Sequence, residues 1–313
     1  MPLAVGPAMT ANLGKLRDRE VFIATLIASD RLNAGQISDA MDRLRSAGCA
    51  PTGSGWIDEG QAADLLFGLR PDLARAALEN AFPQVDVAVQ AMMTRHKKLL
   101  IADMDSTMIT AECIDELADY AGLKPQIAAV TEAAMRGELD FVAALDARVA
   151  LLKGLDARVI EQCLAERIRP TPGAAILIKT MRARGAFTLL ISGGFTRFAE
   201  PVGAMIGFER VVANILGIID GRLDGTVQRP IVDASHKAAT LKAVALNHST
   251  AIESTLAVGD GANDVLMIQS AGLGVAYHAK PIVAAAADVR VDHSDLTALL
   301  YIQGISRKDW VSD

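Results

Sequence analysis

Two aspartates, Asp103 and Asp105, follow a run of four apolar residues, Leu99-Leu100-Ile101-Ala102. Such a run is typical of a short buried strand, so both carboxylates are predicted to lie just beyond its carboxyl end. Acids at this spacing could bind a hard cation, or could supply a nucleophile with a proton donor beside it. They could also do no more than cap the next helix. The stretch alone leaves these three roles open.

A third acid, Asp260, follows a second predicted buried strand, Ser254–Val258. The carboxyl ends of parallel strands meet at one edge of a sheet, so Asp103 and Asp260 come together if their strands are neighbours. Mg²⁺ prefers oxygen ligands and is commonly completed by a substrate phosphate oxygen. Taken alone, Asp260 between two glycines also fits an ordinary turn. Together with Asp103, the Asp105 backbone and the nearby Asp264, it predicts a Mg²⁺ site.

An anion-binding segment is predicted where Ser192-Gly193-Gly194 follows a third apolar run, Phe187–Ile191. Glycines let backbone N–H groups approach an anion closely, and successive N–H groups form a concavity for it. Lys237, at the start of a helix predicted over 236–246, would add a point charge that suits a phosphate. A tight turn and a solvated surface lysine are the plainer alternatives. Nothing local decides between them.

Strands and helices alternate across residues 97–313. Besides the strands above, the pattern predicts strands over 273–277 and 289–291, a helix over 174–184 and a small hairpin over 211–227. This alternation favours an α/β fold with a doubly wound parallel sheet, in which ligands bind beyond the carboxyl ends of the strands. Residues about 111–170 have an almost entirely helical pattern. Such an insertion, directly after the first strand, would cover that edge of the sheet as a cap.

The N-terminal part, residues 1–94, is predicted to form a separate small α+β domain, with the α/β domain that carries the motifs confined to 95–313. Strands over 21–28, around Trp56, over 62–67 and over 85–91 alternate with two helical segments. The order βαββαβ is the ferredoxin-like arrangement. No polar residues converge in it, so catalysis is assigned to the second domain.

Composition limits the class of protein. The chain has 313 residues, of which 51% are hydrophobic and 22% charged, which suits about two globular domains. A net charge of -6 gives no support to a nucleic-acid partner. Cys49, Cys113 and Cys163 lie far apart and are predicted to be buried and reduced. Without a membrane-length apolar run or an evident signal peptide, we expect a cytoplasmic protein with no membrane partner.

The ordered set D-x-D-S-T, S-G-G, a lone lysine and G-D-G-x-N-D resembles the four motifs of the haloacid-dehalogenase-like (HAD) phosphatase superfamily. Within it, the segments Met135–Phe141 and Arg148–Gly154 are similar to the cap of the phosphoserine phosphatase family. The resemblance covers about residues 97–290. It departs from the family pattern mildly at three flanking positions, Met104, Ala144 and Asp146.

The resemblance implies a Mg²⁺-dependent phosphoserine phosphatase that performs the last step of serine biosynthesis. Asp103 would attack phosphorus and become an aspartyl-phosphate. Asp105 would protonate the departing serine oxygen and then deprotonate the hydrolytic water. The Mg²⁺ would be held by Asp103, the Asp105 carbonyl and Asp260.

The same resemblance implies how the phosphoryl group is held. Ser192, Gly193 and Lys237 would contact its oxygens, where charge spreads in the transition state. Asn263 and Asp264 would orient substrate, lysine and metal-bound water around them.

Substrate choice, by the same resemblance, belongs to the cap. Glu112 would bind the ammonium group of phosphoserine and Arg148 its carboxylate. Met135 and Phe141 would exclude water when the cap closes.

Three alternatives remain open. The aspartyl-phosphate could pass to another acceptor, the enzyme could act on another small phosphomonoester, or the core could only sense phosphoserine or an amino acid. The N-terminal domain resembles the small amino-acid-binding (ACT-like) regulatory modules of metabolic enzymes. Feedback by serine, or a homodimer formed through this domain, is therefore a hypothesis that deletion of residues 1–94 would test.

Overall fold

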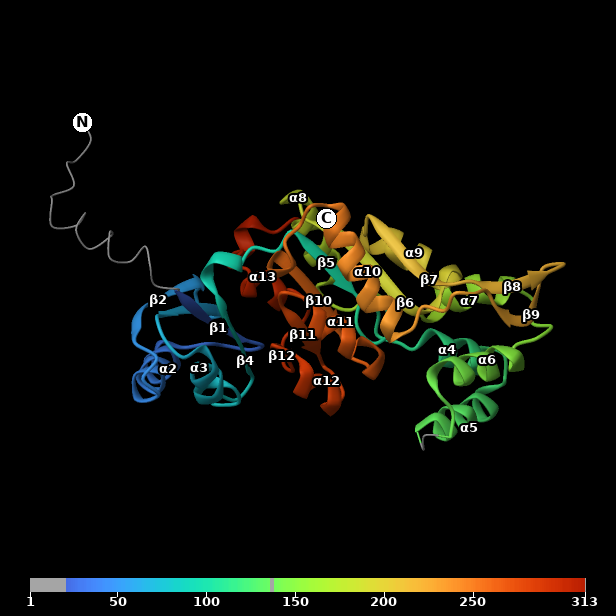
Figure 1. Ribbon diagram of the computed structural model, residues 1–313, viewed down its shortest axis with the longest axis horizontal. Helices are drawn as coiled ribbons and strands as arrows, with labels where there is room; N and C mark the ends of the chain where they lie inside the picture. Colours follow the sequence, from blue (N-terminus) through green and yellow to red (C-terminus); the bar gives the residue numbers. More distant parts are fainter. Residues whose placement is uncertain (1–20, 136–137, 313) are drawn as a thin grey trace. The chain divides into compact units, whose positions relative to one another are not determined.

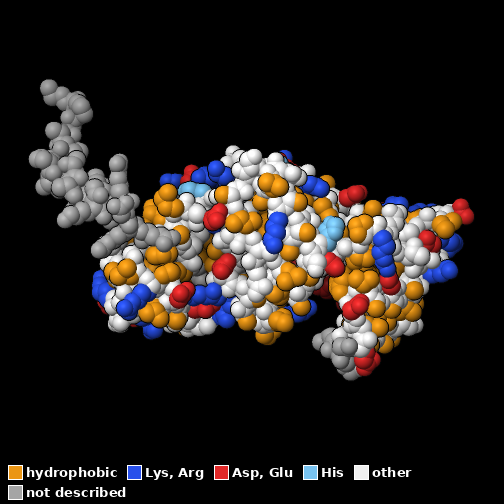
Figure 2. Space-filling model, viewed as in Figure 1, with side chains coloured by type: hydrophobic (Ala, Val, Ile, Leu, Met, Phe, Trp, Pro, Cys, Tyr) orange, Lys and Arg blue, Asp and Glu red, His pale blue; other side chains and the backbone are white. Residues whose placement is uncertain are grey.

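The computed structural model describes residues 21–135 and 138–312, apart from the side chain of Met135. The chain folds into two compact units, Met1–Arg95 and His96–Asp313 (Figure 1). Among the described residues, no helix is long and apolar enough to cross a membrane. Acidic and basic side chains are intermixed over the face that Figure 2 shows.

The first unit has the predicted βαββαβ order. Its elements are β1 (Phe22–Ala28), α2 (Ala34–Ser46), β2 (Pro51–Asp58), β3 (Ala62–Phe67), α3 (Pro71–Leu78) and β4 (Val85–Ala91). The strands lie in the order β2-β3-β1-β4, and each paired neighbour runs antiparallel. The small α+β fold predicted for this part of the chain is confirmed.

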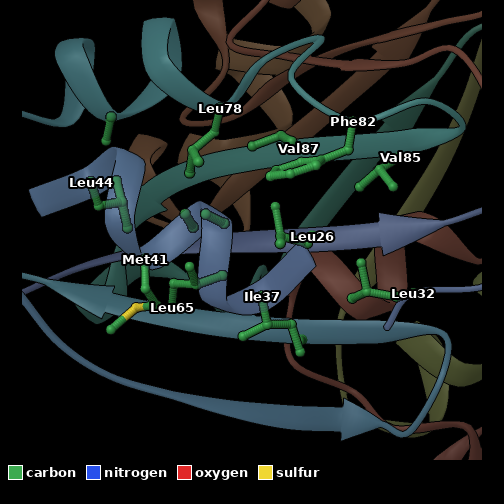
Figure 3. Packing of buried hydrophobic residues seen from close by; sticks show 14 of the residues in the cluster. Leu26, Leu32, Ile37, Met41, Leu44, Leu65, Leu78, Phe82, Val85 and Val87 are labelled. Atoms are coloured by element: carbon green, nitrogen blue, oxygen red, sulfur yellow. The ribbon is translucent and has the colours of Figure 1, made fainter. Parts of the chain in front are cut away.

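One apolar core holds this first unit together. Helix α2 begins at a capping box between Asn33 and Gln36, and its buried residues recur at the spacing of one helix face. Figure 3 shows Ile37, Met41 and Leu44 from this face pointing toward side chains of the sheet strands. The two helices therefore cover one face of the sheet.

The second unit is built on a six-stranded parallel sheet. Its strands lie in the order β12 (Val289–Val291), β11 (Gly274–Tyr277), β10 (Thr255–Gly259), β5 (Leu99–Ala102), β6 (Phe187–Phe195) and β7 (Arg210–Asn214). Each strand pairs in parallel with its neighbour in this order. Because β5 lies between β10 and β6, the three motif-bearing strands are adjacent and end at the same edge.

Helices cover both faces of this sheet, as a doubly wound fold requires. Alternate residues of β5, β6 and β10 pack with α10 (Ala234–Asn247), α11 (Val265–Ser270) and α12 (Pro281–Ala286). The intervening residues Leu100, Leu190 and Leu256 are equally buried. Helices α8 (Ala174–Ala183) and α9 (Thr196–Ile206) pack against β6, and α13 (Ala298–Ile302) follows β12 in the chain.

The predicted helical insertion is present between β5 and β6. It consists of α4 (Cys113–Tyr120), α5 (Lys124–Met135), α6 (Phe141–Leu151) and α7 (Arg158–Arg167). A hairpin of β8 (Leu216–Ile219) and β9 (Arg222–Val227) lies beside α6 (Figure 1). The amide of Gly154 donates to the Leu223 carbonyl over 2.7 Å, so the hairpin is bonded to the cap.

Residues 211–227 differ in part from the prediction of a hairpin. Arg210–Asn214 forms β7, a parallel strand of the main sheet, and the hairpin begins only at Leu216. Short apolar runs such as Val211-Val212-Ala213 have no periodicity that distinguishes a core strand from a hairpin arm. Helix α9 was also missed, because Pro201 inside it argues against a helix on local grounds.

Candidate active site

The loop after β5 delivers the two leading aspartates. The Asp103 amide donates to the Val258 carbonyl of β10 over 3.0 Å, which extends the strand pairing by one residue. The Met104 carbonyl then accepts the amides of Met108, at 2.8 Å, and Ile109, at 3.0 Å. This turn folds the chain back on itself, and both aspartates line the same cavity.

Lys237 is fully buried between two carboxylates. Asp233 caps the start of α10 by accepting the His236 amide, and Lys237 lies in the first turn that follows. Its Nζ donates to Asp103 Oδ1 at 2.5 Å and to Asp264 Oδ1 at 2.8 Å. Although burial opposes its charge, the two carboxylates raise the pKa of Lys237 above its ordinary value. The lysine therefore stays protonated and aims its charge at the predicted nucleophile.

Asp103 and Asp105, the two aspartates after β5, also have raised pKa values. Burial, and then the charge of Asp264, raise the pKa of Asp103 well above its ordinary range, against the effect of Lys237. Burial and the neighbouring Glu112 carboxylate raise the pKa of Asp105 to about 7, although Asp105 accepts the Cys113 amide at 3.1 Å. An acid with that pKa holds a proton in part of the molecules at neutral pH, as a general acid needs.

The cluster of acids fits a hard cation. Carboxylate oxygens of Asp103, Asp260 and Asp264 lie within 4.8 Å of one another, and all three residues are buried. Asp264 already accepts bonds from Lys237 and from the Gly261 amide. Asp260 accepts the Thr107 hydroxyl on one oxygen only, at 3.1 Å, and burial raises its pKa to about 6. Asp103 and Asp260 are therefore the acids best placed to bind Mg²⁺.

The segment Ser192–Gly194 approaches the acids closely. A Cβ at Gly194 would lie 3.1 Å from Asp105 Oδ2, and one at Gly193 would lie 3.1 Å from the ring of Phe141. The Gly194 amide donates to Ser192 Oγ at 2.8 Å. Glycine is favoured here because a Cβ at either position would push a neighbouring side chain aside by a few tenths of an ångström.

The cavity, of about 290 Å³, joins residues of the sheet edge to residues of the cap. Those predicted from the sequence that line it are Asp103, Asp105, Glu112, Phe141, Arg148, Ser192, Gly193, Asp260 and Asn263. Lys237 and Asp264 lie behind this wall and are fully buried. Met135 ends α5, and its side chain lies outside the described residues.

The cap residues present opposite charges to the cavity. Glu112 lies just before α4 and accepts the Ser106 hydroxyl at 2.7 Å. Arg148 lies in the last turn of α6 and bonds the Ala144 carbonyl through Nε, at 3.2 Å. The charges of Asp115, Glu112 and Asp105 act on Arg148, but within the described part of the chain no carboxylate lies close enough to form an ion pair with it. Its remaining N–H groups are therefore available to an anionic ligand.

Several lining residues were not predicted. Ile114, Leu145 and Phe195 supply apolar wall, and Lys280 lies at the rim. The Lys280 amide donates to the Asp260 carbonyl at 3.1 Å, and the charge of Lys280 works against the rise in the pKa of Asp260. Lys280 follows β11, whose carboxyl end lies at the ligand-binding edge of the sheet. Its position after a predicted strand could therefore have indicated that it lies near the site.

This arrangement of aspartates, lysine and glycine-rich loop on a capped α/β sheet belongs to a known class of enzymes. The chain is a member of the haloacid dehalogenase-like hydrolase family, whose model matches residues 100–269.

Individual proteins show which members of this family the chain is similar to. The phosphoserine phosphatase of Streptomyces coelicolor is 44% identical over 248 residues, which are 78% of this chain and 60% of that protein. The chain thus spans less than two thirds of that relative's length. A HAD family hydrolase from Salmonella enterica serovar Typhi superposes with a TM-score of 0.80 at 28% identity, over 90% of this chain and 98% of that one.

A further similar structure is a phospho-aspartyl intermediate analogue of phosphoserine phosphatase. The match covers 66% of this chain and 98% of the chain of that structure. It has a TM-score of 0.61 and is 38% identical. The chain is therefore similar to phosphoserine phosphatases over about two thirds of its length or more.

Proposed function

We propose that this chain is a Mg²⁺-dependent phosphatase that hydrolyses O-phospho-L-serine to L-serine and phosphate, the last step of serine biosynthesis. One observation carries the proposal: a single cavity holds an aspartate pair, a glycine-rich anion loop, and a cap carboxylate and guanidinium. The carboxylate and the guanidinium of the cap are opposite in charge to the ammonium and carboxylate of the substrate, and the loop offers N–H and O–H donors to its phosphate. The names of the relatives agree with this substrate.

The reaction would proceed in two displacements at phosphorus. An Asp103 oxygen forms a bond to phosphorus while the bond from phosphorus to the serine oxygen breaks. Asp105 gives its proton to that oxygen, and a pKa of about 7 allows Asp105 to hold the proton at neutral pH. Asp105 then takes a proton from the water that cleaves the aspartyl-phosphate. Both steps use groups that line one cavity.

The remaining groups in the site compensate charge. Asp103 and Asp260, with the Asp105 carbonyl, would hold Mg²⁺, which reduces the repulsion between a carboxylate and a phosphate. Lys237, Ser192 and the Gly193 amide would hold phosphoryl oxygens as their charge grows. Asp264 keeps Lys237 in position through their 2.8 Å contact.

Recognition of serine would come from the cap. The Glu112 carboxylate suits the ammonium group, and the free N–H groups of Arg148 suit the carboxylate, which they can bind in a bidentate manner. Phe141 lies against Gly193, so the cap already reaches the anion loop. Closure of this wall would exclude water from the acyl-phosphate.

A phosphate-release assay on L-phosphoserine, with and without Mg²⁺, tests the proposal. We expect release that depends on Mg²⁺, and loss of turnover in Asp103→Asn, because an amide cannot form the acyl-phosphate. Asp72→Asn, at an exposed position of α3, is the matched control. Retained turnover in Asp103→Asn would exclude this nucleophile.

The same assay separates the alternatives. Transfer of phosphate to added homoserine, in place of release, would indicate a phosphotransferase. Faster hydrolysis of another compound in a panel of phosphomonoesters would change the substrate. Binding of phosphoserine without any turnover would indicate a sensor.

A further inference from the structure

The anion loop lies where the pairing of two strands breaks. Ile191 of β6 pairs with Val212 of β7, and the next paired residues are Phe195 and Asn214. Three residues of β6, Ser192 to Gly194, therefore face one residue of β7. This is a bulge, which frees the backbone groups of the loop from the sheet ladder.

The side chain of Asn214 replaces the missing ladder partner. It is buried, with 2% of its surface exposed. Its Nδ2 donates to the Gly193 carbonyl at 2.8 Å, and its Oδ1 accepts the Val232 amide at 2.8 Å. A carbonyl can only accept and an amide can only donate, so these partners determine the orientation of the Asn214 amide.

The bond to Gly193 orients one particular peptide. The carbonyl of Gly193 and the N–H of Gly194 belong to the same trans peptide unit and point in opposite directions. With its carbonyl held by Asn214, this unit donates its N–H to Ser192 Oγ, and Ser192 lines the cavity. Between two glycines a peptide rotates easily. The reversed peptide would place a carbonyl oxygen where the N–H now donates to Ser192 Oγ, and would withdraw the Gly193 carbonyl from Asn214.

The second bond connects the loop to the lysine. Val232 directly precedes Asp233, which caps α10, and Lys237 follows in the first turn of that helix. One side chain thus links the anion loop to the start of the helix that carries the buried ammonium. Both polar atoms of the Asn214 side chain are engaged in these bonds, and Asn214 is not among the residues that line the cavity.

We propose that Asn214 is a positioning residue that, by fixing the Gly193 carbonyl, holds the loop Ser192–Gly194 in its anion-binding conformation. The identity of the anion as a phosphoryl group rests on the proposed function. Asn214 acts through the loop and does not touch the substrate.

Asn214→Asp tests this role, because it keeps an acceptor for Val232 while replacing the donor to Gly193 with a repelling oxygen. Asn247→Asp, at an exposed end of α10, makes the same change of charge outside the site. The readouts are the inhibition constant of inorganic phosphate against p-nitrophenyl phosphate hydrolysis, kcat and KM, and the melting temperature. We expect Asn214→Asp to weaken phosphate binding and raise KM about 10- to 100-fold, and Asn247→Asp to change neither.

A double-mutant cycle separates positioning from general damage. If Asn214 acts through the loop, its effect on phosphate binding is largely lost in a Ser192→Ala background and kept in an Arg148→Ala background. The proposal would be overturned if the phosphate inhibition constant of Asn214→Asp lay within twofold of that of Asn247→Asp. It would also be overturned if Asn214→Asp had equal effects in the Ser192→Ala and Arg148→Ala backgrounds. If Asn214→Asp fails to fold, Asn214→Ser is judged by the same readouts.

The outcomes are distinct from those for the proposed function. A wild-type chain that hydrolyses the aryl phosphate but not L-phosphoserine refutes the substrate and leaves the Asn214 test intact. A wild-type chain that binds no inorganic phosphate by calorimetry refutes the anion loop and the role of Asn214 with it.

Discussion

Lys237→Met removes the one ammonium that contacts Asp103 and Asp264, while its unbranched side chain fills much of the same space. Both carboxylates are then buried without a counter-charge, since Lys237 is fully buried and Asp103 is 5% exposed. Removing one partner from a buried ion pair costs about 3–5 kcal/mol. We expect the free energy of unfolding at pH 8 to fall by about that amount in Mg²⁺-free buffer.

Asp103→Asn is the informative comparison. It leaves Lys237 and Asp264 paired one to one, so we expect the free energy of unfolding to stay within about 1 kcal/mol of the wild type even though turnover is lost. In the double variant, roughly 1–3 kcal/mol of the Lys237→Met loss should return, because only one uncompensated carboxylate remains.

The free energy of unfolding of the wild type, the two single variants and the double variant is measured by urea unfolding in EDTA, followed by circular dichroism. Equal m-values check that all four proteins unfold in two states. The Lys237→Met loss should also shrink as the pH falls. Unpaired buried carboxylates have raised pKa values, so the native state takes up protons that the unfolded state does not, and its stability decreases as the pH rises. Additive losses in the double variant, or a loss that does not change with pH, would refute the reasoning.

Three further outcomes are expected. Arg148→Ala should lower kcat/KM for L-phosphoserine about 10- to 100-fold and for p-nitrophenyl phosphate by less than about threefold. Equal losses on both substrates, or the same pattern in the Arg158→Ala control on α7, would show that Arg148 does not bind the serine carboxylate. Asp260→Asn should raise the Mg²⁺ concentration for half-maximal activity at least about tenfold, and an unchanged activation curve would contradict the metal site. Burial lowers the pKa of Lys97 from 10.5 to about 8, so the unfolded state binds more protons between those values. We therefore compare the free energies of unfolding of the wild type and of Lys97→Met. Their difference should rise by about 2 kcal/mol from pH 7.5 to 10, and a constant difference would refute the lowered pKa of Lys97.

Local sequence determined the elements that build the site. Apolar runs of about four to eight residues, such as Leu99–Ala102, predict buried strands because they are too short for a typical helix, and the order of motifs along 97–290 resembles one enzyme family. The βαββαβ unit followed from strand patterns and from the periodic face of α2. Residues 210–227 were harder, because a short apolar run carries no information about which strand it pairs with.

Only the tertiary structure decided which alternative applied to each polar residue. From the sequence, Lys237 was as consistent with a solvated surface lysine as with a phosphate ligand, and the fold buries it between Asp103 and Asp264. Lys280 carried no motif, yet it lies at the rim of the cavity.

At Asp103 and Asp105, the sequence by itself placed two acids after a strand and left metal binding, catalysis and capping open. The fold removes the Asp105 carboxyl group from water and sets it beside Glu112, and these two effects raise its pKa to about 7. Asn214 gave no signal in the sequence, because its two partners come from distant segments. Charge, burial and hydrogen bonding depend on distances in space, and the spacing of residues along a chain sets only the distances between near neighbours.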